Sequence, residues 1–207
     1  MHISEGVLTP QVLAVGAAAA AVGTAVGLKK MDYDRIPKVA VLTAAFFVAS
    51  LIHVPIGPTS VHLTLNGLVG LLLGWAAFPA ILIGLLLQAL LFQFGGLTVL
   101  GVNAVNMGVP ALIVYLLFGY FIKKENSALT VVCSFLAGSL AVLLSILFTA
   151  FSLVFSGEEF TQIAKIMVIA HIPLVIIEGV VNVFIVTLLK KVKPEILEFP
   201  HAVAENA

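Results

Sequence analysis

Long apolar segments, separated by short polar or Pro/Gly-containing breaks, follow one another along almost the whole chain. Most have close to the roughly 20 residues that an α-helix needs to cross a hydrocarbon core of about 30 Å. The segments predicted to be transmembrane helices are residues 8–28, 37–53, 61–77, 79–94, 102–122, 127–156 and 162–189. Pro79 supplies the break between the third segment and the short fourth one, and six helices is the alternative count. The pattern predicts an all-α integral membrane protein with about seven transmembrane helices in one bundle.

The composition supports a bilayer as the solvent. Of the 207 residues, 61% are hydrophobic and 10% are charged, and the mean hydropathy is +1.21, which no water-exposed surface carries. Ten Lys and Arg balance ten Asp and Glu, so charge gives no reason to expect nucleic acid. The single cysteine, Cys133, excludes a disulfide within the chain and a metal site built from several cysteines. No Walker-type phosphate loop occurs, so ATP-driven work needs other subunits.

The basic residues divide unequally between the two ends of the predicted bundle. With seven spans, Lys165 is the only basic residue on one side. The nine on the other side are Lys29, Lys30, Arg35, Lys38, Lys123, Lys124, Lys190, Lys191 and Lys193. Since cytoplasmic loops carry the excess of Lys and Arg, we expect a cytoplasmic C-terminus and an external N-terminus.

Both ends of the chain carry an expectation of their own. No Lys or Arg precedes the first apolar stretch, so a removable signal peptide is not expected and the N-terminus should be retained. The residues after Pro194 are polar and few. We therefore expect a single transmembrane metal-binding domain over residues 1–194 and a short solvated cytoplasmic tail over 195–207.

Small residues recur four positions apart in several predicted helices, a spacing that lets helix backbones approach closely in a membrane. The pairs are Gly16 with Ala20, Ala40 with Ala44, Gly70 with Gly74, and Ser134 with Gly138. We expect these pairs to pack helices within the bundle, with docking against a membrane-embedded partner as the alternative.

Polar groups gather toward the predicted external side. This side holds His2, the stretch from His53 to His62, and the amides Gln88 and Asn103. Moving such groups into hydrocarbon costs several kcal/mol on transfer scales, so their presence calls for a functional explanation. Prolines and glycines interrupt the same segments, and irregular backbone is tolerated in a membrane only when protein buries it or a cavity adjoins it. We therefore predict a plugged pocket that opens outward.

His2 carries the most specific chemistry. A peptide that begins Met-His offers the Met1 amine, the backbone nitrogen of residue 2 and the His2 Nδ1 atom around one centre. A fourth nitrogen would close the square plane expected of Ni²⁺ or Cu²⁺, provided that the amide loses its proton. His62 is the first candidate for this nitrogen, and His53 and His171 are the others. The alternative is that His2 has no special role and that the other histidines bond to backbone.

Further polar residues could support such a site. Glu178 lies seven residues after His171, so the two occupy nearly one helix face and could share a polar network. A buried pair or a helix-packing hydrogen bond is a more common role for Glu178 than metal ligation. The residues predicted to support the ligands are His53, Ser60, Asn66, Gln88, Asn103, His171 and Glu178.

Four stretches resemble one known family. The chain opens on MHISEG and continues with IHVPIGPTSVHLTLNG, LLLQALLFQFGGLTVLGVNAVNMG and HIPLVIIEGVVN. In this order and spacing they resemble the cobalt/nickel substrate-binding subunits, or S components, of energy-coupling-factor transporters, known as the CbiM/NikM family. The resemblance extends from Met1 to about Pro194.

The resemblance implies a site and a set of partners. It implies that the N-terminus inserts into the bundle, and that Met1, His2 and His62 bind Ni²⁺ or Co²⁺, the transported substrate, through four nitrogens. It implies a membrane coupling protein, two ATPase subunits and often a small accessory membrane protein in a bacterial or archaeal cytoplasmic membrane, with no organic cofactor. Cobalt-type relatives often have a Ser-His-Pro version of the stretch that reads SVHLTLNG here, and this departure favours nickel.

Two rival functions belong to other classes. Polar residues on several helices also fit a stand-alone metal channel or secondary carrier. Ser60 beside His62 would suit nucleophilic chemistry in a membrane-embedded enzyme, but no catalytic acid has a defined position. We therefore expect that the chain is not an enzyme.

Overall fold

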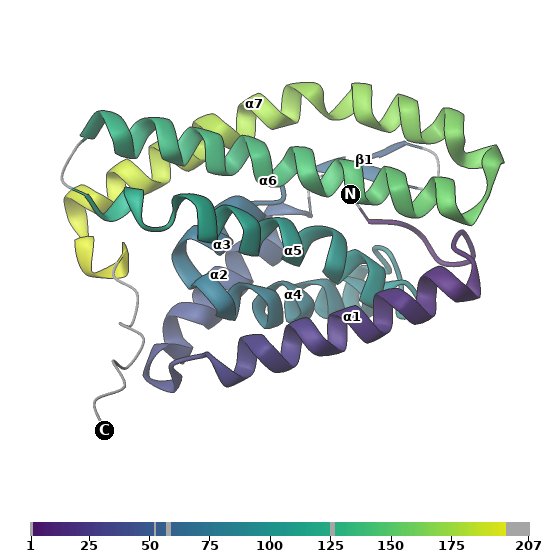
Figure 1. Cartoon of the computed structure of the whole chain (residues 1–207), viewed down its shortest axis with the longest axis horizontal. Helices are drawn as coiled ribbons and strands as arrows, with labels where there is room; N and C mark the ends of the chain where they lie inside the picture. Colours follow the sequence, from purple (N-terminus) through teal and green to yellow (C-terminus); the bar gives the residue numbers. More distant parts are fainter. Residues whose placement is uncertain (1, 52, 57–58, 125–126, 198–207) are drawn as a thin grey trace.

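The computed structural model describes residues 2–51, 53–56, 59–124 and 127–197, and within these ranges the chain forms seven α-helices and a two-stranded hairpin (Figure 1). The helices are α1 (Pro10–Lys29), α2 (Ile36–Ala49), α3 (Asn66–Leu73), α4 (Ala77–Phe92), α5 (Leu100–Phe118), α6 (Ser127–Ser156) and α7 (Thr161–Val192). The strands are β1 (His53–Ile56) and β2 (Thr59–His62). Short 3₁₀ turns are η1 (Tyr33–Arg35), η2 (Gly74–Ala76), η3 (Phe121–Lys123), η4 (Glu158–Phe160) and η5 (Pro194–Leu197).

Five helical stretches in the described residues are long and apolar enough to cross a membrane. They are Pro10–Lys29, Asn66–Phe92, Leu100–Phe118, Ser127–Ser156 and Glu158–Val192. An all-helical membrane protein is thus supported at this coarse level. Helix α2 has 14 residues and α3 has 8, so the count of seven spans and the direction of the termini stay predictions.

A hairpin interrupts the segments that were predicted to be the second and third membrane helices. Strands β1 and β2 pair antiparallel, with His53 opposite His62. Helix was predicted up to residue 53 and again from 61, so the helical prediction is wrong at these edges. Pro55 cannot donate to a helical ladder, and β-branched neighbours such as Val54 and Val61 favour extended backbone.

The stretch from α3 to α4 reverses direction inside the bundle. Gly74 has φ +58°, a backbone conformation that favours glycine, and it ends α3. A Cβ atom on Gly70 would lie 2.2 Å from the carbonyl oxygen of Ala111, so α3 lies against α5. The ring of Phe78 then packs on Gly108, at an earlier turn of α5. The chain therefore turns back at η2, and α4 returns toward the end from which α3 came.

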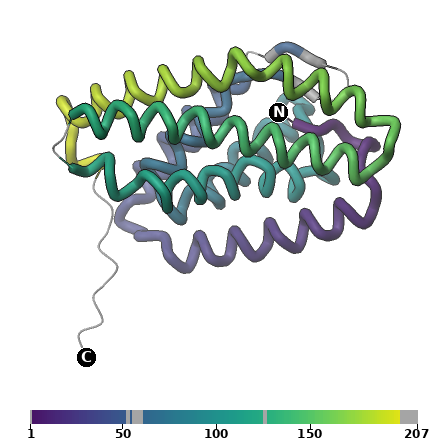
Figure 2. Tube along the Cα trace, turned by 45° about the horizontal axis from the view of Figure 1, so that its top comes forward, coloured from purple at the N-terminus to yellow at the C-terminus, as the bar shows by residue number. Residues whose placement is uncertain are grey.

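The helices form layers around this reversed pair. Helices α6 and α7 lie side by side along one face of the bundle, and α1 lies along the opposite face (Figures 1 and 2). In the most apolar window of the α3–α4 stretch, 78% of residues are buried, whereas in that of α1 only 17% are. The short central helices are therefore the core of the bundle, and α1 presents most of its surface outward.

The small-residue pairs contact neighbouring helices, with one exception. A Cβ atom on Gly16 would lie 2.9 Å from the Cα atom of Val102 in α5, and Gly70 lies as close to α5. Gly138 lies against the backbone of α7, where a Cβ atom would be 2.6 Å from a carbonyl oxygen. These contacts confirm the packing prediction. The pair Ala40 and Ala44 is exposed, so the prediction of packing within the bundle is wrong there.

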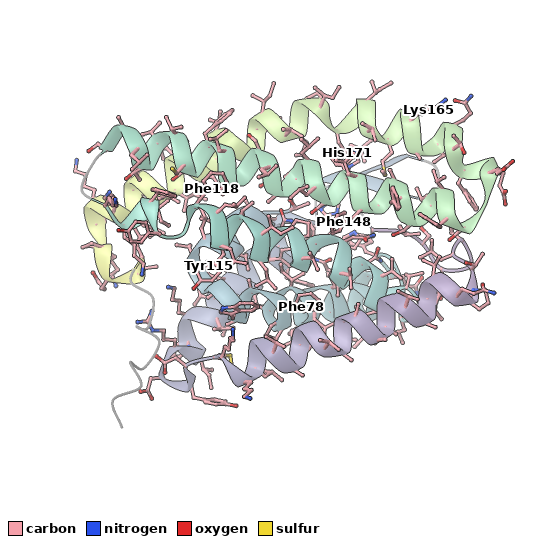
Figure 3. The ribbon with its side chains drawn as sticks, in the orientation of Figure 1. Phe78, Tyr115, Phe118, Phe148, Lys165 and His171 are labelled. Atoms are coloured by element: carbon pink, nitrogen blue, oxygen red, sulfur yellow. The ribbon has the colours of Figure 1, made fainter. Side chains whose placement is uncertain are left out.

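Lysines gather at one end of the bundle. The Lys190 ammonium donates to the carbonyl oxygen of Lys124 and, at 2.6 Å, to Thr130 Oγ1. The Lys30 ammonium lies 3.7 Å from the centre of the Trp75 ring. Lys165 lies at the opposite end of the bundle, near the start of α7 (Figure 3). The basic residues that the sequence predicted for one side of the membrane therefore lie mainly at one end of the bundle.

The start of the predicted tail packs onto the bundle. Residues 194–197 form η5, Leu197 is buried, and Lys38 of α2 donates to the carbonyl oxygen of Ile196. The expectation of a solvated tail from residue 195 is therefore wrong for its first residues, because two apolar side chains, Ile196 and Leu197, join the core. Residues 198–207 lie outside the described residues.

Candidate metal centre

The segment before α1 folds back into the bundle. Its N-terminal end lies within the bundle, and from His2 onward the chain runs outward to the start of α1 (Figure 2). Asn103 of α5 holds the Ile3 main chain on both sides: the Ile3 N–H donates to Asn103 Oδ1 at 3.0 Å, and Asn103 Nδ2 donates to the Ile3 carbonyl oxygen at 3.2 Å. Farther out, Glu5 Oε1 accepts from the Thr98 N–H at 3.0 Å. Met1 lies outside the described residues.

Gln88 of α4 fixes the ring of His2. The His2 Nε2 atom lies 2.7 Å from Gln88 Oε1, and both side chains are buried. Gln88 Nε2 donates to Ser50 Oγ and to the carbonyl oxygen of Phe47, so the Gln88 oxygen must face the ring. These partners assign the proton of a neutral His2 ring to Nε2 and its lone pair to Nδ1. Nδ1 is the atom that a chelate with the N-terminal nitrogens requires.

His62 ends strand β2 beside His2. The two ring centroids are 4.6 Å apart, with an angle of 21° between the planes. The Nδ1 atom of His62 lies 2.8 Å from the carbonyl oxygen of Leu63, so in a neutral ring Nδ1 carries the proton and Nε2 the lone pair. Burial lowers the pKa of the His62 imidazole well below its usual range, and the His2 ring acts in the same direction. Burial and the His2 ring therefore favour the neutral form of His62, the form that binds metals.

Two buried imidazoles, in their neutral form, suit a borderline divalent transition-metal cation. Among the described residues, no group of three or more His, Cys, Asp or Glu side chains could hold a metal ion. Backbone or terminal nitrogens are further donors that could complete a site around the two rings. Because the ring planes of His2 and His62 are nearly parallel, one ion cannot lie in both planes until a ring turns.

The turn after His62 is bonded to three helices. Glu178 of α7, which is fully buried, accepts hydrogen bonds from the Thr64 and Leu65 N–H groups. Asn66 Nδ2 donates to the Met107 carbonyl oxygen of α5 at 3.1 Å, and to an α6 hydroxyl at 2.8 Å. In this structure Glu178 and Asn66 therefore hold the backbone next to His62 and do not contact the two rings through any of these bonds.

The other predicted residues are less closely tied to the rings. His171 is buried in α7 (Figure 3), and its Nδ1 atom lies 2.7 Å from the Met167 carbonyl oxygen one turn earlier. The charge of a protonated His171 would also lower the pKa of His62. His53 pairs with His62 through the hairpin backbone. The side chains of His53 and Ser60 lie outside the described part of the chain.

The hollow surface of the bundle lies elsewhere. A groove of about 1030 Å³ runs between α1, α5 and α6, and its lining is apolar except for Gln11, Asn106 and Ser152. Neither His2 nor His62 belongs to this lining.

Comparisons with known proteins agree on the class of protein. The profile of the CbiM family, described as "Cobalt uptake substrate-specific transmembrane region", matches residues 2–196. A Haemophilus influenzae protein provisionally described as a metal transport protein is 42% identical over 199 residues, covering 95% of this chain and 97% of that protein. A Sorangium cellulosum cobalt transport protein is 31% identical, covering 96% of this chain and 95% of its own length.

Two further similarities bear on the metal and on the fold. A fused nickel transport protein of Rhodobacter capsulatus is 42% identical over 115 residues, which are 53% of this chain and 33% of that protein. The crystal structure of a transition metal transporter superposes with a TM-score of 0.77 at 31% identity, covering 93% of both chains. The described bundle is thus the fold of a solved metal transporter.

Proposed function

The chain belongs to the CbiM family of cobalt-uptake transmembrane proteins, and from this premise we propose that it is the substrate-capture subunit of an ATP-driven energy-coupling-factor importer for Ni²⁺ or Co²⁺. Its relatives are described as cobalt, nickel or general metal transport proteins. The importer would be completed by a membrane coupling protein, two ATPase subunits and a small accessory membrane protein, in a bacterial or archaeal cytoplasmic membrane.

One observation carries the proposal: the buried His2 ring lies beside His62, and its Nε2 atom is hydrogen-bonded to Gln88. This bond assigns the lone pair of a neutral His2 ring to Nδ1, the atom that the chelate requires. In our proposal the Met1 amine, the backbone nitrogen of residue 2 and His2 Nδ1 form fused chelate rings around the ion. His62 supplies the fourth nitrogen through Nε2. Four nitrogens in a plane match the square geometry of d⁸ Ni²⁺.

Binding follows from the same contacts. An external ion displaces protons from the amine and the amide, loses its water, and is held by four nitrogens. One of the two nearly parallel rings turns so that the ion lies in both ring planes. A site of this strength releases its ion only when the protein changes conformation, and ATP hydrolysis in the partner subunits would supply that change.

The choice between the two metals is part of the proposal. The stretch SVHLTLNG lacks the Ser-His-Pro form common in cobalt-type relatives, and we therefore propose nickel. Equal concentrations of Ni²⁺ and Co²⁺, offered together to the purified protein, should leave mainly nickel bound when the metal content is measured. Mainly cobalt in the product would reverse this part of the proposal.

The site is tested by removing one donor at a time. His2→Ala and His62→Ala should each lower nickel affinity by about a hundredfold or more, since binding energies of roughly 10–16 kcal/mol are shared among four ligands in protein zinc sites. Ser134→Ala, a change at another buried polar position, is the matched control and should bind as wild type. Wild-type affinity in His62→Ala would contradict the proposed ligand set.

The transport mode needs a separate experiment. Liposomes that contain only this chain should bind Ni²⁺ but accumulate none, because the proposed importer needs its ATPase subunits. Addition of the complete set of partners and internal ATP should start uptake. Accumulation by the chain alone would instead identify a channel or a secondary carrier.

A further inference from the structure

We propose that Glu178 is a positioning residue for the metal centre, which anchors from α7 the turn that orients His62. The inference rests on the proposed function, because it assigns the anchored turn to the metal-binding imidazole. It treats Glu178 as bound to the backbone and not as a metal ligand.

The contact is dense and fully buried. Glu178 Oε1 accepts from the Thr64 N–H, from the Thr64 hydroxyl at 3.0 Å and from the Leu65 N–H at 3.0 Å. Glu178 Oε2 also lies 3.2 Å from the Leu65 nitrogen. Glu178 and Thr64 are both 0% exposed. One carboxyl group therefore satisfies two consecutive backbone N–H groups, of which that of Thr64 belongs to a fully buried residue.

Helix α3 begins without a side-chain cap and in a strained backbone conformation. Its N-cap residue is Leu65, whose side chain cannot accept a hydrogen bond from the first turn. Leu65 also has φ +49°, in the left-handed region that a leucine adopts rarely. A residue in this conformation persists only when its surroundings hold it. From another helix, Glu178 accepts from the N–H of this N-cap residue and from the N–H of the residue before it, at the helix end where a carboxyl group is favoured.

The anchored turn is connected to the His62 ring by one hydrogen bond. The Leu63 carbonyl oxygen, which bonds His62 Nδ1 at 2.8 Å, belongs to the residue just before Thr64. Fixing the Thr64 backbone thus fixes the acceptor that sets the His62 tautomer and ring direction. Asn66 adds a second tie, since its Oδ1 atom also lies 3.0 Å from the Thr64 hydroxyl oxygen while its amide nitrogen donates to α5 and α6. The turn is therefore held from three helices.

Asn182 offers a matched comparison on the same helix. It lies four residues after Glu178, on the same face of α7, and it is also fully buried. Neither polar atom of its side chain has a hydrogen-bond partner in the structure. A substitution there changes a buried polar residue of α7 without removing an anchor of the His62 turn.

The test compares Glu178→Gln, Glu178→Ala and Asn182→Ala in the full-length protein, with and without Ni²⁺. In metal-free protein, hydrogen exchange at the Thr64 and Leu65 amides should be faster in Glu178→Gln and fastest in Glu178→Ala. Nickel affinity should fall in the same order, by roughly tenfold to a hundredfold, the range seen when groups behind metal ligands are removed. Asn182→Ala should match wild type in both measurements. If Glu178→Ala does not fold, the milder Glu178→Gln still carries the test.

The two readouts separate this inference from the function on which it rests. Unchanged amide exchange in Glu178→Gln would overturn the anchor. Faster exchange with wild-type nickel affinity and an unchanged nickel absorption spectrum would overturn its role in orienting His62. Absence of nickel binding in the wild type would overturn the proposed function, and exchange in the metal-free protein would still show whether Glu178 holds the turn.

Discussion

The two ends of the bundle are built in different ways. At the histidine end, defined by His2, His62, Gln88 and Asn103, buried polar side chains bond one another and the backbone. At the lysine end, where Lys30, Lys124 and Lys190 gather, the charged groups lie over aromatic rings or donate to carbonyl oxygens near the surface.

We therefore assign metal binding to the histidine end and membrane orientation to the lysine end. Buried polar groups are costly when any partner is missing, so the histidine end holds together only as a complete set. Exposed lysines are tolerated singly, and their excess at one end is the signal that orients a membrane protein. Changes at the histidine end should therefore alter metal binding, and changes at the lysine end should alter insertion or stability.

The largest effect is expected from a change at the first residue. Adding one glycine before Met1 removes the free amine from its chelate position, so nickel affinity should fall by at least about a hundredfold. The same glycine added after Ala207 should leave affinity unchanged. Calorimetric titration of both variants gives the comparison, and equal affinities would show that the amine is not a ligand.

A smaller loss is expected when a residue behind the ligands changes. Gln88→Leu removes the acceptor of His2 Nε2, and Asn103→Leu removes both bonds to the Ile3 main chain. Each should weaken nickel binding by roughly tenfold to a hundredfold. Lys190→Gln, at the lysine end, is the control and should bind as wild type. Equal nickel affinities in Gln88→Leu, Asn103→Leu and Lys190→Gln would contradict the proposed difference between the two ends.

Nickel affinity should fall tenfold to a hundredfold for each pH unit of acidification. One amide proton is released at every pH, and a terminal amine with a usual pKa of about 7.7–8.0 releases another below that range. Affinity should therefore fall about tenfold per unit above pH 8 and about a hundredfold per unit below it. Because burial lowers the pKa of His62, its own protonation should add to the loss only well below its usual range. Titrations from pH 9 to 6 measure these slopes, and a flat profile would contradict the displacement of protons.

The smallest effect on affinity is expected from packing at the lysine end. A Cβ atom on Gly27 would lie 2.7 Å from the Trp75 carbonyl oxygen and 2.5 Å from Pro79 Cδ. Gly27→Ala should therefore destabilise the bundle by about 1–3 kcal/mol, as overpacking does. Thermal unfolding in detergent should show a lower midpoint, while nickel affinity stays within about twofold. A large loss of affinity would mean that the two ends are coupled.

The sequence alone was most informative where chemistry is unusual for a membrane. His2, His62, Gln88 and Asn103 stand out as polar residues in apolar surroundings, and the structure brings all four into one buried region. The long helices α1, α5, α6 and α7 follow from apolar length. In each case a single strong physical preference decides the outcome.

Other features depend on contacts that leave no mark in the local sequence. Glu178 accepts from the backbone N–H groups of Thr64 and Leu65, and every residue type except proline carries such a group. The eight-residue length of α3 depends on a reversal at Gly74 that hydropathy does not register. The exposure of Ala40 and the burial of Leu197 were likewise decided by tertiary packing.

The most direct measurement is the absorption spectrum and magnetism of the nickel-loaded protein with an unmodified N-terminus. Four nitrogens in a plane predict a yellow, diamagnetic adduct with one Ni²⁺ per chain, which is lost when one residue precedes Met1. A pale, paramagnetic adduct, or a spectrum that the added residue leaves unchanged, would contradict the proposed N-terminal metal centre.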